Sequence, residues 1–288
     1  MSTALRHNAG HYAGICAACA GLLLALWAGT AGADTLKPRW EWGMGIAAAT
    51  LRDYPGSRNY RTYALPFPWF VYRSDRLYLG REGSHGVLWR SIDSELDVSL
   101  SLNPSVHQQS NPERAGMPVL DSTLGIGLRE RITFWRDESS GLRLSAHLPL
   151  RVVYALHHGA LAPVGLQVQP GLSLDHNLAG AWTWGIGTAI SFADARYNDY
   201  FYGVEPAYAT AARPAYTAPG GFAGWQLSSR ISYQHQHHSV SVFARIEGLE
   251  GAGFADSPLV STPHAGTLGV AWSYRIGTSK EMVPGNEH

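Results

Sequence analysis

The sequence lacks several features that would place it in a common protein class. Its two cysteines, Cys16 and Cys19, lie near the N-terminus, so the rest of the chain cannot form a disulfide. The 22 basic residues balance the 22 acidic ones, which argues against a nucleic-acid-binding protein, since such proteins usually carry surplus positive charge. Charged residues make up only 15% of the chain, against about 25% in typical soluble domains.

Long apolar runs are also scarce. One lies at residues 13–28, after Arg6 and His7, and is followed by Ala31-Gly32-Ala33, which has the form of a signal-peptidase cleavage site. We therefore expect residues 1–33 to be a cleaved signal peptide. Beyond them no run approaches the ~20 apolar residues that a membrane helix requires. An exported chain with little charge and no spanning helix is either a soluble all-β domain or a membrane β-barrel.

Apolar and polar side chains alternate along much of the chain, as in a strand with one apolar and one polar face. In residues 142–156 leucines occupy one face, and Arg143, Ser145 and His147 occupy the other. The same alternation recurs at 40–46, 164–175, 182–192, 225–233 and 268–276. Strands in soluble proteins usually have about five or six residues, whereas about 9–11 tilted residues cross a bilayer. The length of these runs favours the membrane barrel.

The sequence thus predicts an all-β fold, a transmembrane antiparallel up-and-down β-barrel of about 12 strands. The expected strands cover residues 40–51, 60–72, 75–80, 85–92, 94–102, 120–135, 142–156, 163–175, 179–193, 222–236, 239–249 and 266–277. Without the hairpin at 75–92 there would be about ten, with the same parity. The barrel would occupy residues 34–277, and residues 278–288 would form a flexible polar tail outside it.

The links between these strands alternate in length. Short links at 73–74, 93, 136–141, 176–178 and 237–238 alternate with mostly longer ones at 52–59, 81–84, 103–119, 157–162, 194–221 and 250–265. Bacterial outer-membrane barrels have short periplasmic turns and long external loops. We therefore expect both termini to lie in the periplasm.

The segment 53–73, DYPGSRNYRTYALPFPWFVYR, combines a polar turn with many aromatic residues. We expect Leu65, Phe67, Trp69 and Val71 to face lipid, and the tyrosines to lie nearer the membrane interface, where amphipathic rings are favoured. The turn at residues 53–58 would then project into water.

The same segment resembles the N-terminal signature of the MipA/OmpV (MltA-interacting protein) outer-membrane family. Three further stretches resemble later blocks of that family, in the same order: GMPVLDSTLGIG at 116–127, YFYGVEPAYA at 200–209 and GFADSPLVSTPHAGTLGVAWSYR at 253–275. The resemblance covers nearly all of the chain beyond the signal peptide.

This resemblance implies a non-enzymatic barrel in the outer membrane of a Gram-negative cell, surrounded by lipid. For the founding member it implies a scaffold that brings together a lytic transglycosylase and a murein synthase. Other members are described as porins or adhesins, so porin and surface adhesin remain alternative functions.

Charged residues on the polar faces of the expected strands would point into the barrel lumen. Two interpretations are open: a network of paired charges that fills a narrow interior, which we favour because unpaired buried charge is costly, and a selective pore or ligand site. The polar faces carry seven arginines and six carboxylates, and these nearly balanced signs argue against strong ion selectivity. The six carboxylates are those of Glu41, Glu95, Asp97, Asp121, Asp175 and Glu247. The predicted lumen network comprises Glu41, Arg129, Arg131, Arg143, Arg151, Asp175, Arg230, Arg245, Glu247 and Arg275.

Two other polar groupings invite a chemical interpretation. Ser145 and His147 share one strand face, as a hydrolase nucleophile and base would, but no G-x-S-x-G motif accompanies them. His235 and His237 have a spacing that could share a metal ion, but no nearby cysteine or carboxylate completes a ligand set. We expect a solvated turn at these histidines, no catalytic residue, no metal site and no cofactor.

Overall fold

The computed structural model describes residues 36–73, 78–79, 87–91, 93–106, 111–137, 139–157, 159–178 and 181–284. All of them belong to the second of two units, 33–288; the predicted signal peptide lies outside the described residues. The strands are β1 (Leu36–Pro38), β2 (Trp40–Arg52), β3 (Tyr60–Arg73), β4 (Tyr78–Leu79), β5 (Val87–Arg90), β6 (Ser94–Asn103), β7 (Thr123–Asp137), β8 (Leu142–His157), β9 (Ala160–Val168), β10 (Gly171–Asn177), β11 (Trp182–Ala193), β12 (Gly221–His235), β13 (His238–Gly248), β14 (His264–Thr278) and β15 (Met282–Pro284).

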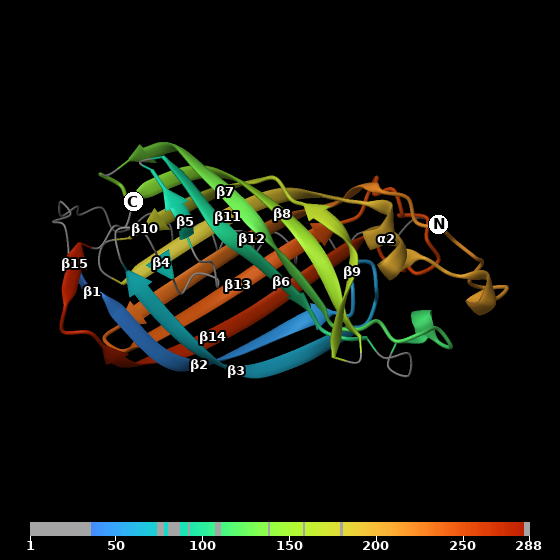
Figure 1. Cartoon of the computed structure of the whole chain (residues 1–288), viewed down its shortest axis with the longest axis horizontal. Coiled ribbons are helices and arrows are strands. Elements are labelled where there is room, and N and C mark those ends of the chain that lie inside the picture. The colour runs from blue at the N-terminus through green and yellow to red at the C-terminus, as the bar shows by residue number, and fades with distance from the viewer. Residues whose placement is uncertain are drawn as a thin grey trace, which may run out of the picture. The chain divides into compact units, whose positions relative to one another are not determined.

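The strands from β2 to β14 form one antiparallel sheet, which is rolled into an up-and-down barrel (Figure 1). The pairing order is β4-β3-β2-β14-β13-β12-β11-β10-β8-β7-β6-β5, and β9 pairs with β8 and β11. In β14 the pairing with β2 brings the last barrel strand beside the first. The predicted fold class is confirmed.

One predicted strand, 163–175, is divided into β9 and β10. The division falls at Gln169 and Pro170, but the ladder continues across it, because Gln169 N donates to Pro149 O at 3.1 Å and Ile190 N donates to Pro170 O at 3.0 Å. When β9 and β10 are counted as one, the 13-stranded sheet of the described residues has the predicted 12 strands. The predicted hairpin 75–92 is represented by β4 and β5, and its remaining parts at 75–77, 80–86 and 92 lie outside the described residues.

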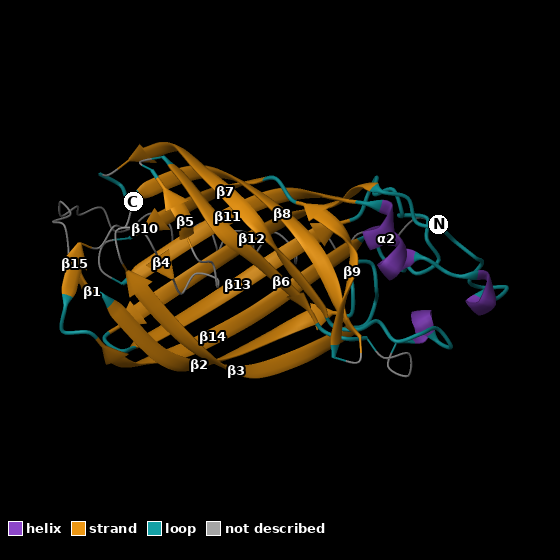
Figure 2. Ribbon diagram, viewed as in Figure 1, coloured by secondary structure: helices purple, strands orange, loops and turns teal. Residues whose placement is uncertain are grey.

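The two ends of the barrel differ. The described parts of the links 53–59, 104–122, 158–159, 194–220 and 249–263 gather at one end, which we call the loop end, and those of the links 91–93, 138–141, 178–181 and 236–237 gather at the other, the turn end. Figure 2 shows the short helices at the loop end; they are α2 (Ala195–Tyr202), η3 (Pro112–Arg114) and η4 (Pro206–Tyr208). Short and long links alternate as predicted in the described residues, except that the link predicted at 157–162 is shorter, because β8 ends at His157 and β9 begins at Ala160. The predicted links at 74 and 81–84 lie outside the described residues.

Beside the turn end, β15 pairs with β1 in a separate two-stranded antiparallel sheet. Leu36 is paired with Pro284 and Pro38 with Met282. The segment expected as a flexible tail therefore contains a short ordered strand. This strand is not part of the barrel sheet.

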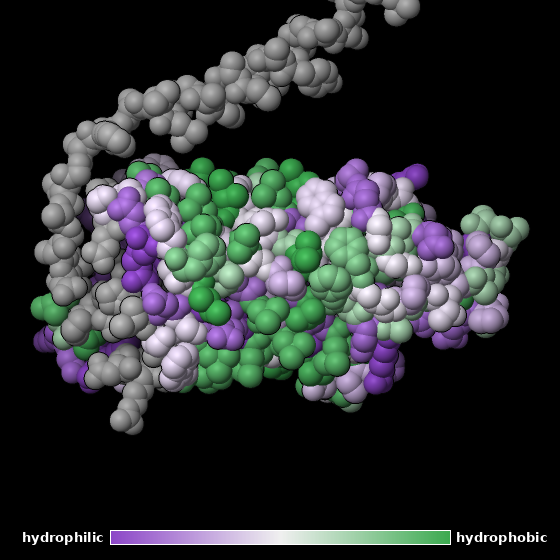
Figure 3. Space-filling model, turned by 90° about the horizontal axis from the view of Figure 1, so that it is seen from above, coloured by the Kyte–Doolittle hydropathy of each residue, from purple (hydrophilic) through white to green (hydrophobic). Residues whose placement is uncertain are grey.

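The outer surface of the barrel is apolar. On β7 and β8, for example, Ile126, Leu128, Leu148 and Leu150 are exposed, while Ser145 is fully buried on the opposite face. Hydrophobic residues cover much of the middle of the face shown in Figure 3. Among the described residues no helix is both long and apolar enough to cross a membrane. Exposed apolar side chains on successive strands are what a barrel presents to lipid.

The expected facing of β3 is wrong for Phe67, Trp69 and Val71. Trp69 is 9% exposed and Val71 1% exposed, because both point to the lumen. The reason lies on β2, where Gly43 and Gly45 are paired with Trp69 and Phe67. A Cβ on Gly43 would lie 2.7 Å from the Trp69 ring, so the aromatic rings of β3 fill the space that the β2 glycines leave open.

The residues between these aromatics face the other way. Pro66 and Pro68 share the outer face with Phe70, which is 49% exposed. Proline cannot donate a ladder hydrogen bond, and in sheets it is confined to edges, strand starts and bulges. The described part of β3 is paired with β4 only at Tyr72 and Arg73, which fits two prolines in the middle of this strand.

The main hydrophobic core of the described residues lies in the loops and not between strands. Four loops, 53–59, 104–122, 194–220 and 249–263, supply the buried residues Tyr54, Val106, Met117, Leu120, Phe201, Tyr202, Val204, Ala218, Leu249, Ala252, Phe254 and Leu259. The Tyr202 and Phe254 rings stack with centroids 3.7 Å apart. We call this cluster the loop cap. It packs the four loops against one another across the loop end.

The turn at 53–58 belongs to this cap, so the expectation that it projects into water is wrong. Tyr54 is 2% exposed and Ser57 is fully buried. Their hydroxyls donate to Oε2 of Glu113 at 3.1 Å and 2.7 Å, and the Arg58 amide donates to Oε1 at 3.0 Å. Glu113 comes from a different loop, and its carboxylate therefore fastens two loops of the cap together.

These contacts change the acidity of the two groups. Burial would raise the pKa of Glu113, but hydrogen bonds from Ser261, Ser57, the Arg58 amide and Tyr54 outweigh it and hold the pKa below its usual value. Burial, followed by the neighbouring Glu113 carboxylate, raises the pKa of Tyr54, which keeps its hydroxyl protonated as a donor.

The inward and outward faces of β12 can be tested with adjacent residues. Leu227 is 44% exposed on the outer face, whereas Ser228 lines the lumen cavity described below. We expect Leu227→Arg to destabilise the folded barrel by about 2–4 kcal/mol, the cost of arginine on a lipid face near the bilayer midplane. Ser228→Arg should cost clearly less, because the lumen is polar. Urea unfolding in lipid vesicles measures both, and equal losses would contradict the assigned faces.

The loop cap should loosen in acid. Because the pKa of Glu113 is lowered by folding, its contribution to cap stability is present above the unfolded pKa, ~4.3, and is lost as the pH falls through the folded pKa. Limited proteolysis of the folded barrel should show loop cleavage rising below about pH 4.

The matched variant is Glu113→Gln, which removes the negative charge from these hydrogen bonds. One hydrogen bond to a charged group is worth about 1.5–3 kcal/mol. This variant should be cleaved at least about tenfold faster at neutral pH and should lose most of the acid-dependent increase. A cleavage rate like that of the wild type at both pH values would show that Glu113 does not hold the loops.

Candidate functional site

Below the loop cap, the barrel lumen contains a cavity of about 710 Å³. Its walls come from β2, β6–β14 and adjoining residues, and its roof comes from loop-end residues that include Tyr197, Phe201, Tyr202 and Phe254. This volume lies within the range of about 300–1,000 Å³ that is usual for small-molecule sites. The cavity is therefore the first candidate for a functional site.

Most of the predicted lumen network lines this cavity. The members that do so are Arg129, Arg131, Arg143, Arg151, Asp175, Arg230, Arg245 and Glu247. They lie on β7, β8, β10, β12 and β13, at positions that alternate with the apolar outer residues. The structure thus places these eight side chains around one space, although their role remains a proposal.

The arginines differ in what they contact. Arg129 is bound in a bidentate manner to the fully buried Asp97, with Nη2 2.7 Å from Oδ2 and Nε 3.0 Å from Oδ1. Arg245 donates to Glu247 at 3.1 Å. Within the described residues Arg151 donates to neutral groups, at 2.8 Å to Ser99 and at 3.3 Å or more to Gln167 and Gln169. Arg129 and Arg245 are thus paired with carboxylates, as the favoured interpretation requires, whereas the described hydrogen bonds of Arg151 go to neutral side chains.

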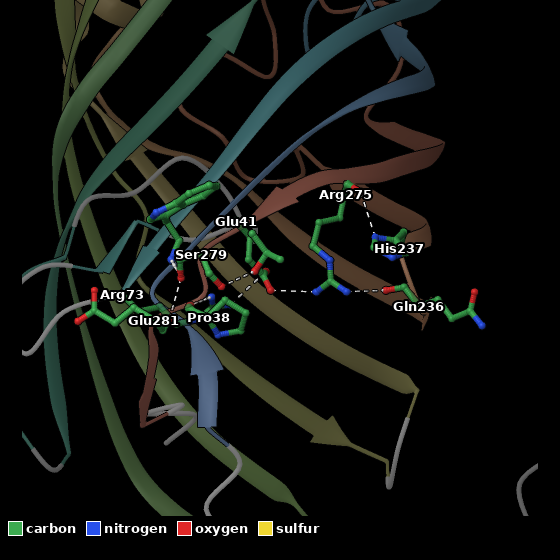
Figure 4. A network of polar contacts seen from close by, with 10 residues as sticks. Pro38, Glu41, Arg73, Gln236, His237, Arg275, Ser279 and Glu281 are labelled. Carbon is green, nitrogen blue, oxygen red and sulfur yellow. Dashed lines mark hydrogen bonds and ion pairs between the residues drawn. The ribbon is translucent and has the colours of Figure 1, made fainter.

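The other two predicted members, Glu41 and Arg275, lie at the turn end (Figure 4). Glu41 is 5% exposed and forms ion pairs with Arg275 at 2.9 Å and Arg73 at 3.5 Å. Arg275 also donates to Gln236 O at 3.1 Å, in the β12–β13 turn. The buried carboxylate therefore ties β2 to β3 and β14, and breaking such a pair usually costs about 3–5 kcal/mol.

The same region holds the β1–β15 sheet against the barrel (Figure 4). Arg73 donates through Nη1 to Pro38 O at 2.9 Å, and Arg39 pairs with Glu281 at 3.0 Å. The Ser279 hydroxyl accepts from Trp40 N at 3.2 Å and donates to Glu281 O at 2.7 Å. Segments that are more than 200 residues apart in the sequence, as with Trp40 and Ser279, are thereby fixed side by side.

Sequence reasoning missed several buried polar residues. Asp97 is not one of these, since its place on a polar strand face predicts that it points into the lumen, and it lies opposite Arg129 in the β6–β7 register. Asn111 and Glu113 gave no signal, because they lie in an irregular loop and their partners Asp53 and Ser57 are more than 50 residues away. Such contacts depend on the tertiary structure alone.

In the part of the chain that the structure describes, neither the serine and histidine of β8 nor the histidines near residue 236 form an evident reactive site. Ser145 shares a hydrogen bond with Thr133 at 3.0 Å, while His147 lines the cavity. His235 and His238 close a tight β12–β13 hairpin in which Gln236 has a φ of 51°. The expected turn at these histidines is confirmed. Within the described ranges, no three His, Cys, Asp or Glu side chains are grouped so that they could hold a metal ion.

Comparison with known proteins supports an outer-membrane location. Outer membrane protein OmpV of Vibrio cholerae is 32% identical over 90 residues, which cover 30% of this chain and 34% of that protein. Outer membrane protein Omp26La of Vibrio anguillarum is 31% identical over 90 residues, with the same two coverages, 30% and 34%. The matched region thus spans about a third of each of these relatives.

Among solved structures, a bacterial polysaccharide outer membrane secretin superposes with a TM-score of 0.40 and 9% identity, over 82% of this chain and 99% of that chain. The family described as MltA-interacting protein MipA matches residues 44–276, which is most of the sequence and every barrel strand in whole or in large part. This chain therefore belongs to the MltA-interacting protein MipA family and is an outer-membrane β-barrel protein.

Proposed function

We propose that this protein is a non-enzymatic outer-membrane anchor that docks a lytic transglycosylase at its turn end. The family description, which names an interaction with MltA, is the source of the partner. The barrel supplies the membrane anchor. A murein synthase recruited to the same assembly would make the protein a scaffold for murein remodelling.

The observation that carries this proposal is the β1–β15 sheet. In its register Leu36, Pro38 and Met282 share one face, because Pro38 is paired with Met282 and Leu36 lies two residues before Pro38 on the same strand. Leu36 is 60% exposed and Met282 is 48% exposed. This sheet stands outside the barrel sheet, so an exposed apolar face on it supports contact with a protein.

The side of the membrane follows from the loop lengths. Short turns of outer-membrane barrels face the periplasm, and the β1–β15 sheet adjoins the turn end (Figure 1). A murein-cleaving enzyme also works in the periplasm. Cleavage of residues 1–33 during export, which we include in the proposal, would leave the new N-terminus a few residues before β1.

A porin remains the second candidate, and the lumen cavity is the observation that favours it. The loop cap covers this cavity with buried aromatic residues. Conduction through the lumen would therefore require the cap to move. An anchor needs no such movement, and for this reason we place the docking function first.

The docking proposal can be tested by capture of a purified lytic transglycosylase on the folded barrel. Leu36→Asp and Met282→Asp should each weaken binding at least about tenfold, since burying one apolar side chain is worth about 1.5–3 kcal/mol and an aspartate adds a desolvation cost. The matched control is Val119→Asp, an exposed apolar residue of the loop end, which should leave binding unchanged.

Deletion of residues 279–288 supplies a second measurement, because it removes β15 but leaves β14 complete. The barrel should still insert and keep its heat-modifiable migration in gels, while transglycosylase capture should fall. If capture survives this deletion and both turn-end substitutions but is lost with Val119→Asp, partners dock at the loop end and the proposal fails.

A further inference from the structure

The lumen cavity carries an excess of positive charge. Among the described residues, seven arginines line it, against three carboxylates, those of Asp53, Asp175 and Glu247. Two more carboxylates lie next to this wall: Asp97, paired with Arg129, and Glu95, opposite Arg131 in the β6–β7 register. Arginines still outnumber carboxylates by two when these are included.

Two of the arginines are placed to receive an anion. Arg151 lines the cavity, and its hydrogen bonds within the described residues go to Ser99, Gln167 and Gln169, none of which carries charge. The Nε of Arg131 is buried without a hydrogen-bond partner in the described structure. A buried guanidinium is costly unless it is paired and hydrogen-bonded. An oxyanion at either guanidinium would offset that cost. The two arginines are not neighbours in the sheet, because Arg151 is paired with Gly127 and Arg131 with His147, four positions apart on the β7–β8 ladder.

The roof of the cavity has a different character from its wall. Tyr197, Phe201, Tyr202 and Phe254 line the upper part. Tyr197 and Phe201 have ring centroids 5.0 Å apart, and Phe201 and Phe254 are 6% and 1% exposed. Such a roof offers aromatic contacts to the apolar part of a ligand, while the wall offers guanidinium groups to its charged part.

We infer that the cavity binds a small organic anion, with a carboxylate or phosphate against Arg151 and an aromatic or other apolar body beneath the loop cap. The volume, the surplus of arginine and the aromatic roof each support this assignment. It goes beyond the proposed docking function and does not depend on it, because the cavity and the β1–β15 sheet lie in different parts of the fold.

The competing explanation is that the arginines serve only to fill the lumen as members of ion pairs. That explanation accounts for Arg129 with Asp97 and for Arg245 with Glu247. It does not account for Arg151, whose hydrogen-bond partners are neutral. The two explanations differ in a measurable way, since only a binding site distinguishes an anion from a cation of the same shape.

The test uses phenyl phosphate as the probe and benzylamine as the cation of similar shape, with binding measured by titration calorimetry on the detergent-folded protein at low salt. We expect phenyl phosphate to bind and benzylamine not to bind. Arg151→Gln should weaken phenyl phosphate binding at least about tenfold, as for the loss of a hydrogen bond to a charged group. Arg131→Gln, which leaves the contact with Arg151 in place, should weaken it less. Arg151→Lys, which keeps the charge, should retain more of the affinity than Arg151→Gln.

The matched control is Arg196→Gln, since Arg196 is exposed on α2 and does not line the cavity. It should bind phenyl phosphate like the wild type. Heat-modifiable gel migration shows that each variant is folded.

No binding of phenyl phosphate at millimolar concentration, equal binding of benzylamine, or equal losses from Arg196→Gln and Arg151→Gln would each overturn the assignment. Inorganic phosphate serves as a further arm: an affinity equal to that of phenyl phosphate would contradict the role given to the aromatic roof.

Discussion

The constraint on which the rest of the structure depends is that backbone N–H and C=O groups inside a bilayer must be hydrogen-bonded within the protein. This chain meets it with antiparallel ladders such as β7–β8 and β2–β3. A rolled sheet of such strands has one apolar and one polar face by alternation, as the exposed Leu148 and the buried Ser145 show. Because the outer face is turned to lipid and the inner face is polar, the barrel wall itself cannot supply a conventional hydrophobic core.

The two ends of the barrel compensate in different ways. At the loop end, apolar residues of four loops form a cap of their own, fastened by the buried hydroxyls of Tyr54 and Ser57 on Glu113. At the turn end, the buried Glu41 carboxylate joins neighbouring strands through Arg73 and Arg275. Inside the wall, Trp69 packs over Gly43 and fills space near that end. The cavity is the part of the lumen that neither end fills.

How much could be predicted from the sequence depended on how far apart the interacting residues lie. Long strands such as β8 and β14 were predictable, because the alternation of apolar and polar side chains can be read from neighbouring residues. Lipid on one side of the sheet requires this alternation to be regular. The facing of β3 was not, because Phe67, Phe70 and Trp69 are aromatic on both faces and the deciding feature, Gly43, lies on another strand. The cap network and the β1–β15 pairing join segments that are distant in the sequence, so no local sequence pattern predicts them. The lumen arginines were predicted individually, but their local excess over carboxylates appeared only when the strands were placed around one space.

The most direct test of this account is a scan of single spin labels along β3 from Pro66 to Val71, in reconstituted protein without residues 1–33, which hold both cysteines. Collision with lipid-soluble oxygen measures exposure to the bilayer at each position. The account predicts high oxygen accessibility at residues 66, 68 and 70 and low accessibility at residues 67, 69 and 71, where the side chains enter the lumen. The opposite alternation would place Phe67 and Trp69 in lipid, and the packing of the lumen described above would then be wrong.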